Sequence, residues 1–149
     1  MIRKAESSDI EQMVGLLKEL FFIEEDFSFD ERMQRNGLAM MLGDNEKCCI
    51  MVAVSGEQVI GMSSAQLLVS TAEGGMVALI EDIVVTKSYR GQGIGKKLLL
   101  SIEKWTNKKG AKRLQLLADK NNFSALGFYD QQNWAITHLI CLRKKQERS

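Results

Sequence analysis

A glycine-rich segment in the second half of the chain has the residue types of an anion-binding loop. It reads Arg90-Gly91-Gln92-Gly93-Ile94-Gly95-Lys96. Glycines at alternate positions remove the Cβ atoms that would hold a ligand away from the main chain, so successive N–H groups can converge on phosphate oxygens. An apolar run precedes the segment and a helical pattern follows it, so the positive end of a helix dipole adds to the attraction. The segment therefore predicts a binding site for a diphosphate.

Two other phosphate-binding loops fit this spacing poorly. A nucleoside triphosphate loop needs G-x-x-x-x-G-K-[ST], but Arg90 stands where the first glycine belongs and Lys97 replaces the hydroxyl residue that holds magnesium. A dinucleotide fingerprint needs G-x-G-x-x-G near the start of a βαβ unit, with an acid about 20 residues later. The chain has G-x-G-x-G past its midpoint, and the segment 111–113 at that distance contains no acid.

The elements that position the loop follow from hydrophobic periodicity and turn residues. Helices are predicted over about 10–21, over 31–42, after the loop until Gly110, and over 122–131. Strands are predicted near Cys48–Val54, from Val59 toward Val69, over Met76–Val85 and Leu114–Ala118, and as one or two strands over Trp134–Arg143. Strands that alternate with both hairpins and helices indicate a mixed α/β (α+β) fold with a largely antiparallel sheet flanked by helices.

Length and composition limit the class of protein. A chain of 149 residues with 45% hydrophobic content predicts a single domain over 1–149. The formal net charge of +1 gives no reason to expect nucleic acid or a membrane as a partner. The charged start of the chain and the lack of a long apolar run predict a cytoplasmic protein. Three cysteines without metal-ligand spacing are expected to be reduced core residues, and with His138 as the only histidine we expect no metal.

Two motifs in order carry a resemblance to a known family. The pattern R-x-x-G-x-G begins at Arg90, after the apolar run Ala78–Val85, and resembles the acetyl-CoA signature of the GCN5-related N-acetyltransferases, the GNAT superfamily. The later pattern N-x-x-A-x-x-x-Y, from Asn122 to Tyr129, is similar to a helix that this family places after its next strand. The resemblance implies a GNAT-like sheet with a splayed central strand pair that holds the cofactor. One departure is Asn133, which stands where relatives usually have glycine, but Asn tolerates a left-handed turn.

The same resemblance implies how acetyl-CoA is held. Backbone groups of the strand end, at Ile83, Val84 and Val85, would bond the pantetheine amides, and one N–H there would stabilise the thioester oxygen. The N–H groups from Gly91 to Lys96 would hold the diphosphate, with Arg90 supporting the loop. Asn122 would bond the pantetheine arm or position the strand end.

The acceptor amine must lose a proton, since a lysine-like amine with a pKa of about 10.4 arrives largely as an ammonium. Glu81 and Asp82 lie in the strand before the loop and are the candidate bases, directly or through a water. Strand alternation predicts that Glu81 shares a face with Ile83 and Val85, and that Asp82 lies on the other face. By resemblance Glu81 matches a position that serves as base in several members of the family. An ion pair with a basic neighbour explains a carboxylate there equally well.

The leaving thiolate needs a proton, and by resemblance Tyr129 is the general acid. A phenol with an unperturbed pKa of about 10 is protonated at pH 7. A core aromatic on the same helix is the structural alternative. Direct transfer in a ternary complex requires no covalent intermediate, because holding both reactants in line supplies much of the acceleration.

The acceptor is expected to be a small cationic amine. In the segment 21–31 acids alternate with aromatics, which suits an ammonium group, although a solvated loop explains the pattern equally well. The alternatives are a protein acetyltransferase acting on lysine or N-terminal amines, and a CoA-binding module without turnover. The family resemblance also leaves a homodimer open.

Overall fold

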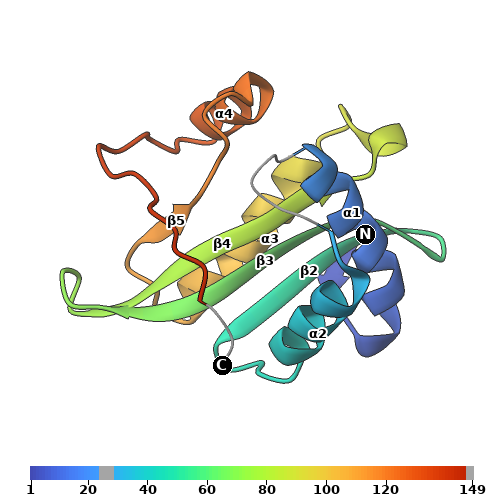
Figure 1. Ribbon diagram of the computed structural model, residues 1–149, viewed down its shortest axis with the longest axis horizontal. Helices are drawn as coiled ribbons and strands as arrows, with labels where there is room; N and C mark the ends of the chain where they lie inside the picture. Colours follow the sequence, from blue (N-terminus) through green and yellow to red (C-terminus); the bar gives the residue numbers. More distant parts are fainter. Residues whose placement is uncertain (24–28, 147–149) are drawn as a thin grey trace. The chain divides into compact units, whose positions relative to one another are not determined.

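The computed structural model describes residues 1–23 and 29–146, which belong to two compact units, 1–116 and 117–149. We describe each unit by itself. The first unit contains a five-stranded sheet of order β1-β2-β3-β4-β5 (Figure 1). The strands are β1 (Ile2–Lys4), β2 (Cys48–Ser55), β3 (Gln58–Ser70), β4 (Gly75–Val85) and β5 (Leu114–Leu116). The first three pairings are antiparallel and β4–β5 is parallel, which confirms the predicted mixed, largely antiparallel sheet.

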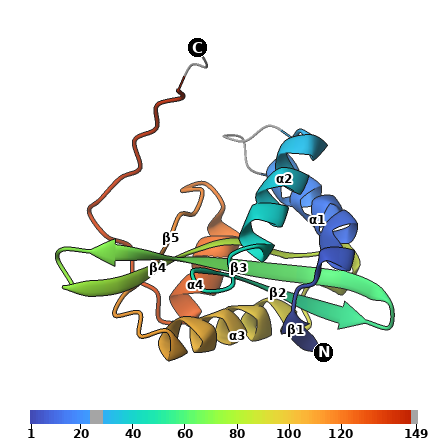
Figure 2. The same ribbon diagram turned by 90° about the horizontal axis from the view of Figure 1, so that it is seen from below.

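Three helices cover the two faces of this sheet. They are α1 (Ile10–Ile23), α2 (Glu31–Leu42) and α3 (Ile94–Lys108). Figure 2 shows α1 and α2 on one face and α3 on the other. All three were expected from helical periodicity. Asp30 caps α2 by accepting a hydrogen bond from the Arg32 N–H at 3.0 Å, and Gly43 follows its last residue.

The core divides according to these faces. On one face Met13 and Leu38 from α1 and α2 pack with the sheet residues Val52, Met62 and Val84. On the other face Leu98 of α3 packs with Ala53 and Ile60. Because both faces of the sheet are buried under helices, β2 and β3 are largely apolar along their length.

Gly61 allows α3 to approach the sheet closely. A Cβ built on Gly61 would lie 2.9 Å from Leu98 Cδ1 and 3.1 Å from the Val84 carbonyl oxygen. Leu98 is fully buried, so its side chain has little room to move away. The helix that follows the glycine-rich loop is thus seated directly on β3.

The second unit contains α4 (Phe123–Gln131), as predicted, and its next turn uses Asn133 with a φ of 70°. The predicted strand over Trp134–Arg143 is wrong, because no strand is found in the described residues after α4. The strand after α3 also ends earlier than expected, at Leu116 instead of Ala118. An apolar, β-branched stretch has only a tendency to extend, and a strand forms where a neighbour accepts its hydrogen bonds.

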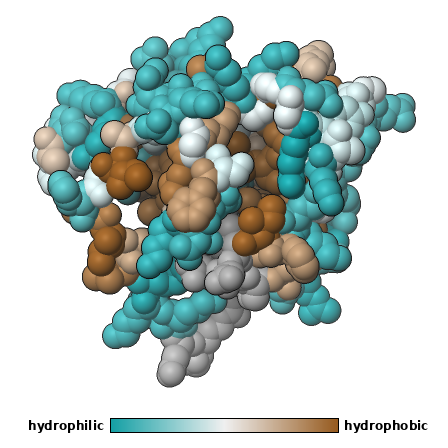
Figure 3. Space-filling view, turned by 90° about the horizontal axis from the view of Figure 1, so that it is seen from above, coloured by the Kyte–Doolittle hydropathy of each residue, from teal (hydrophilic) through white to brown (hydrophobic). Residues whose placement is uncertain are grey.

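Several large apolar side chains are exposed at the surface. Phe22 is 92% exposed and Val69 is 78% exposed. Figure 3 shows one face of the molecule, where apolar side chains lie as patches among hydrophilic ones. No interface follows from these residues, and the homodimer stays a prediction. No helix in the described part of the chain is long and apolar enough to cross a membrane.

The three cysteines differ in environment. All are free thiols, with Cys49 buried, Cys48 half-buried and Cys141 exposed. The expectation of core cysteines is confirmed for Cys49 and wrong for Cys141.

Candidate active site

Two glycines give the loop before α3 its shape. Gly91 has a φ of 79° and Gly93, the residue that caps α3, has a φ of 81°. Both values lie in the left-handed region, which costs L-residues with a Cβ about 1–2 kcal/mol. A Cβ at either position would meet no atom within 4 Å. Within the protein itself, the backbone conformation and not a contact with neighbouring atoms therefore favours glycine at these two positions.

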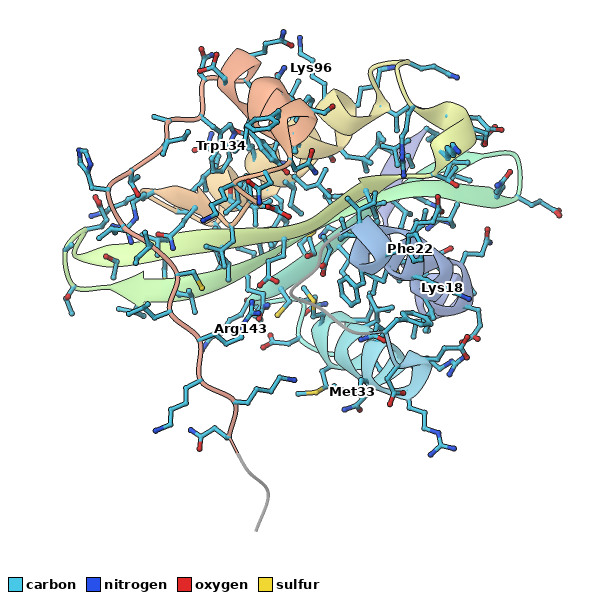
Figure 4. The ribbon with its side chains drawn as sticks, turned by 45° about the horizontal axis from the view of Figure 1, so that its top comes forward. Lys18, Phe22, Met33, Lys96, Trp134 and Arg143 are labelled. Atoms are coloured by element: carbon cyan, nitrogen blue, oxygen red, sulfur yellow. The ribbon has the colours of Figure 1, made fainter. Side chains whose placement is uncertain are left out.

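The amides of this loop are available to an anion. Within the described residues, the N–H groups from Gly91 to Lys96 have no hydrogen-bond acceptor, and the first intrahelical bond runs from the Lys97 N–H to the Gly93 carbonyl at 3.2 Å. The N–H groups in the first turn of a helix point outward along its axis and carry its positive dipole end. Lys96 is exposed in the same turn (Figure 4). These donors fit a diphosphate such as that of coenzyme A.

Arg90 contacts both the end of β4 and helix α1. Its Nε donates to the Val85 carbonyl oxygen at 2.8 Å, which ties the start of the loop to the end of β4. Its Nη2 lies 3.9 Å from Oε1 of Glu19, a residue of α1. The expectation that Arg90 supports the loop agrees with these contacts.

The sequence did not point to Glu19. Its carboxylate accepts a hydrogen bond from the Thr86 hydroxyl, at 3.0 Å from Oε2, and lies 3.3 Å from the Lys87 amide nitrogen. A single acid on an amphipathic helix carries no signal of a contact 67 residues away in the chain.

A β-bulge changes which residues of β4 share a face. The β3–β4 register shifts between Met62 and Ser64, so that Met62 pairs with Val84 and Ser64 pairs with Glu81. Two residues of β4 thus stand opposite Ser63, and one of them, Asp82, has a φ of 55°.

This bulge corrects the predicted alternation. Side chains of directly paired residues lie on the same face of the sheet. Glu81 therefore shares a face with Val84, the face covered by α1 and α2, and not with Val85. The alternation rule failed because the extra residue at Asp82 moves every following side chain of β4 to the opposite face.

Ser64 brings the two candidate bases to one place. Its buried hydroxyl lies 3.0 Å from the Glu81 carbonyl oxygen and 3.4 Å from Oδ2 of Asp82. Asp82 thus reaches the Ser64 side of the sheet, where Glu81 also lies. Glu81 is exposed and Asp82 is half-buried, so a solvent water can reach the Glu81 carboxylate.

The end of β4 is open along its β5 side. The parallel pairing joins Ala78–Ile80 to Leu114–Leu116, and no further pair with β5 is formed in the described residues. β4 continues to Val85, which places Ile83 and Val85 beyond the paired part. Main-chain groups of this stretch are suited to bond an extended ligand along the strand.

The remaining predicted residues lie in the second unit, on α4. Asn122 caps this helix, with its side-chain oxygen accepting from the Ala125 N–H at 3.1 Å. Sequence reasoning had not considered this role. Tyr129 is half-buried, and its ring makes edge contacts with Phe128 and Trp134, at centroid distances of 5.3 and 6.2 Å.

The acidic–aromatic segment is described only in part, since residues 24–28 lie outside the described residues. Lys18 and Phe22 extend from α1 (Figure 4). The Lys18 ammonium lies 5.7 Å from the ring centroid of Phe29, so a cation already lies next to that ring.

The described residues include no group of three or more His, Cys, Asp or Glu that could hold a metal ion.

Comparison with known proteins identifies the family of this chain. The model of the "Acetyltransferase (GNAT) family" matches residues 10–134. An uncharacterized N-acetyltransferase of Archaeoglobus fulgidus is 26% identical over 133 residues, which are 89% of this chain and 90% of the relative.

Solved structures share the fold. A transcriptional regulator from Bacillus halodurans is 26% identical with a TM-score of 0.85, over 97% of this chain and 99% of the other. An aminoglycoside acetyltransferase from an uncultured soil metagenomic sample, in complex with sisomicin, has a TM-score of 0.80 at 22% identity, over 99% and 96% of the two chains. The family model spans most of the chain, including the glycine loop and α4. The chain therefore belongs to the acetyltransferase (GNAT) family and is an acyltransferase with acetyl-CoA as its co-substrate.

Proposed function

We propose that the protein transfers the acetyl group of acetyl-CoA directly to a primary amine, and that its acceptor is a small cationic amine. The observation that carries this proposal is the loop from Gly91 to Lys96, whose N–H groups have no acceptor among the described residues. These amides would hold the diphosphate of the coenzyme. The open end of β4, from Ile83 to Val85, would bond the pantetheine amides.

The acceptor must be deprotonated before it attacks the thioester carbonyl. Glu81 accepts this proton in the proposal, directly or through a water. Its exposure and its place on the Ser64 face support this role, and the nearby Asp82 is the second candidate. As the nitrogen bonds to the carbonyl carbon, negative charge develops on the carbonyl oxygen, and a main-chain N–H between Ile83 and Val85 would stabilise it.

The tetrahedral intermediate then loses the thiolate of coenzyme A, its nitrogen releases its second proton to solvent water, and the carbonyl re-forms as an amide. Tyr129 would supply the proton that makes CoA–SH the leaving group. This role comes from the motif that begins at Asn122, and the half-buried state of the Tyr129 side chain is compatible with it. The products are the N-acetylated amine and free coenzyme A.

The charge of the site supports a cationic acceptor. Two carboxylates on one face of the sheet attract an ammonium group before its proton is removed. The fold shared with an aminoglycoside acetyltransferase is compatible with a small polyamine-like acceptor.

The test is an amine panel in which release of free CoA is followed with a thiol reagent and the product mass confirms one added acetyl group. The panel contains linear polyamines, an aminoglycoside, simple primary amines and lysine-containing peptides. We expect turnover with small cationic amines and little with peptides. Turnover with peptides alone would replace the proposal with a protein acetyltransferase, and coenzyme binding without turnover of any amine would indicate a binding module.

A further inference from the structure

Glu19 contacts the segment that joins β4 to the glycine loop. This segment comprises Thr86 and the 3₁₀ turn Lys87–Tyr89. The Glu19 side chain is 35% exposed, so Glu19 is neither buried in the core nor a free surface group. Glu19 lies on α1, so its contacts join this helix to the segment after β4.

Two hydrogen-bond donors and one guanidinium group converge on this carboxylate. The Thr86 hydroxyl lies 3.0 Å from Oε2 and 3.3 Å from Oε1, the Lys87 N–H donates to Oε1 at 3.3 Å, and Nη2 of Arg90 is 3.9 Å from Oε1. Arg90 is itself held by the Val85 carbonyl. The carboxylate therefore hydrogen-bonds the start of this segment, at Thr86 and Lys87, and forms an ion pair with Arg90, the residue just before the glycines.

We infer that Glu19 is a positioning residue for the coenzyme: it holds the residues before Gly91 so that the loop amides are already arranged for the diphosphate. This inference rests on the proposed function of the loop. Gly91 and Gly93 have no side chain to limit their conformations, and ordering such residues at the moment of binding costs conformational entropy. A loop fixed in advance at its entry loses less entropy when the ligand binds.

The direction in which coenzyme affinity changes when Glu19 is removed separates the positioning role from simple charge repulsion. A carboxylate close to a diphosphate site repels the ligand, so removal of a bystander charge would leave coenzyme affinity unchanged or raise it. If Glu19 positions the loop, its removal lowers the affinity despite the relief of repulsion. The two explanations therefore predict opposite changes in Kd.

The experiment measures the Kd of free CoA by titration calorimetry, together with KM for acetyl-CoA and kcat. Glu19→Ala removes all the contacts, and we expect a Kd about 10-fold higher, equivalent to one charge-assisted hydrogen bond. Glu19→Gln keeps an acceptor for Thr86 but loses the charge, and a rise of about 3-fold is expected. Because the contact lies outside the reacting groups, kcat at saturating acetyl-CoA should stay within about 2-fold of the wild type.

Two further variants test the contact itself. Thr86→Val removes one donor and should raise Kd by about 3-fold, and its effect should largely disappear in the Glu19→Ala background because the partner is gone. Glu11→Gln is the matched control, since Glu11 lies on the same helix but binds Arg35 of α2. It should leave Kd unchanged. Thermal unfolding of every variant shows that the protein is folded at the temperature of the titration.

The outcomes distinguish the two proposals. If wild-type protein binds CoA and the Glu19 variants bind it equally well or more tightly, the positioning role is wrong and the proposed function stands. An equal loss of affinity in Glu11→Gln would also contradict the role, because it would reflect general destabilisation. If the wild type binds no CoA, both the proposed function and this inference fail.

Discussion

The hydroxyl of Ser64 lies 3.0 Å from the main-chain carbonyl oxygen of Glu81, and Ser64 is only 1% exposed. This contact fixes the bulge of β4 on the side where the candidate base lies. Ser64→Ala leaves a carbonyl without this donor and should lower the free energy of unfolding by about 1–2 kcal/mol in urea titrations. We also expect a lower kcat, because Glu81 would lose its fixed position.

Ser63→Ala is the matched control for this variant. Ser63 is equally buried, but it donates to the Leu98 carbonyl on the α3 face, at 3.1 Å. It should destabilise the protein to a similar extent and leave kcat nearly unchanged. Equal effects of both variants on kcat would show that the bulge does not position the base.

The left-handed residues of the loop should not tolerate a Cβ. Gly93→Ala should raise the Kd of CoA by about 10-fold, because the free loop of the variant relaxes away from the observed φ of 81° and binding must restore it at a cost of about 1–2 kcal/mol. Gly37→Ala is the control, since Gly37 lies inside α2 with open space around it. That substitution should raise stability by about 0.5–1 kcal/mol without changing Kd. An unchanged Kd in Gly93→Ala would remove the loop from the coenzyme site.

Tyr129→Phe tests the general acid. The variant lacks the phenol proton but keeps the ring contacts with Phe128 and Trp134. We expect kcat to fall by about 10²-fold or more, with little change in the Kd of CoA. Stopped-flow or steady-state CoA release gives kcat, and calorimetry gives Kd. A variant with wild-type kcat would exclude Tyr129 as the acid and leave it a core aromatic.

Acid should weaken the protein through Asp9. The Arg3 guanidinium donates to Asp9 Oδ2 at 2.8 Å and Oδ1 at 3.0 Å, and holds the pKa of that carboxyl below its usual value. A pKa lower in the folded than in the unfolded state stabilises the fold above the unfolded value of about 3.9, and this stabilisation disappears as the pH falls through the folded pKa. Asp9→Asn should therefore lower the free energy of unfolding by about 2 kcal/mol at pH 7, and the difference from the wild type should shrink as the pH falls below about 3.9.

The measurement is the free energy of unfolding of both proteins across this pH range. Glu11→Gln, at the exposed pair with Arg35, should give a smaller difference at neutral pH. A pH-independent difference between Asp9→Asn and the wild type would contradict the assignment.

The cysteines should react in order of exposure and thiolate content. Burial raises the pKa of Cys49 to about 11, so its reactive thiolate is scarce at pH 8. Burial, followed by the nearby Asp44 charge, also raises the pKa of Cys48. Iodoacetamide at pH 8 should modify the exposed Cys141 first, Cys48 slowly and Cys49 only after unfolding, as peptide mass spectrometry can show. Modification of Cys49 at the rate of Cys141 would contradict the buried environment, and denatured protein, in which all three react, is the control.

The sequence was sufficient for features that depend on neighbouring residues. Helical periodicity and the Gly43 signal predicted α2 with its observed bounds. Alternate glycines predicted a loop before α3, and the structure adds that Gly91 and Gly93 have positive φ. The same local motifs predicted the family, which the family model confirms.

Only the tertiary structure decided which side chains meet. The extra residue at Asp82 reverses the face of Glu81 relative to Val85, because a bulge arises from the pairing of two strands and leaves no periodic signal in one of them. Glu19 reaches Thr86 across 67 positions of the chain, a contact that depends on how α1 packs on the sheet. The apolar stretch after Trp134 has the composition of a strand, but a strand also needs a hydrogen-bonded neighbour, and composition contains no information about that partner.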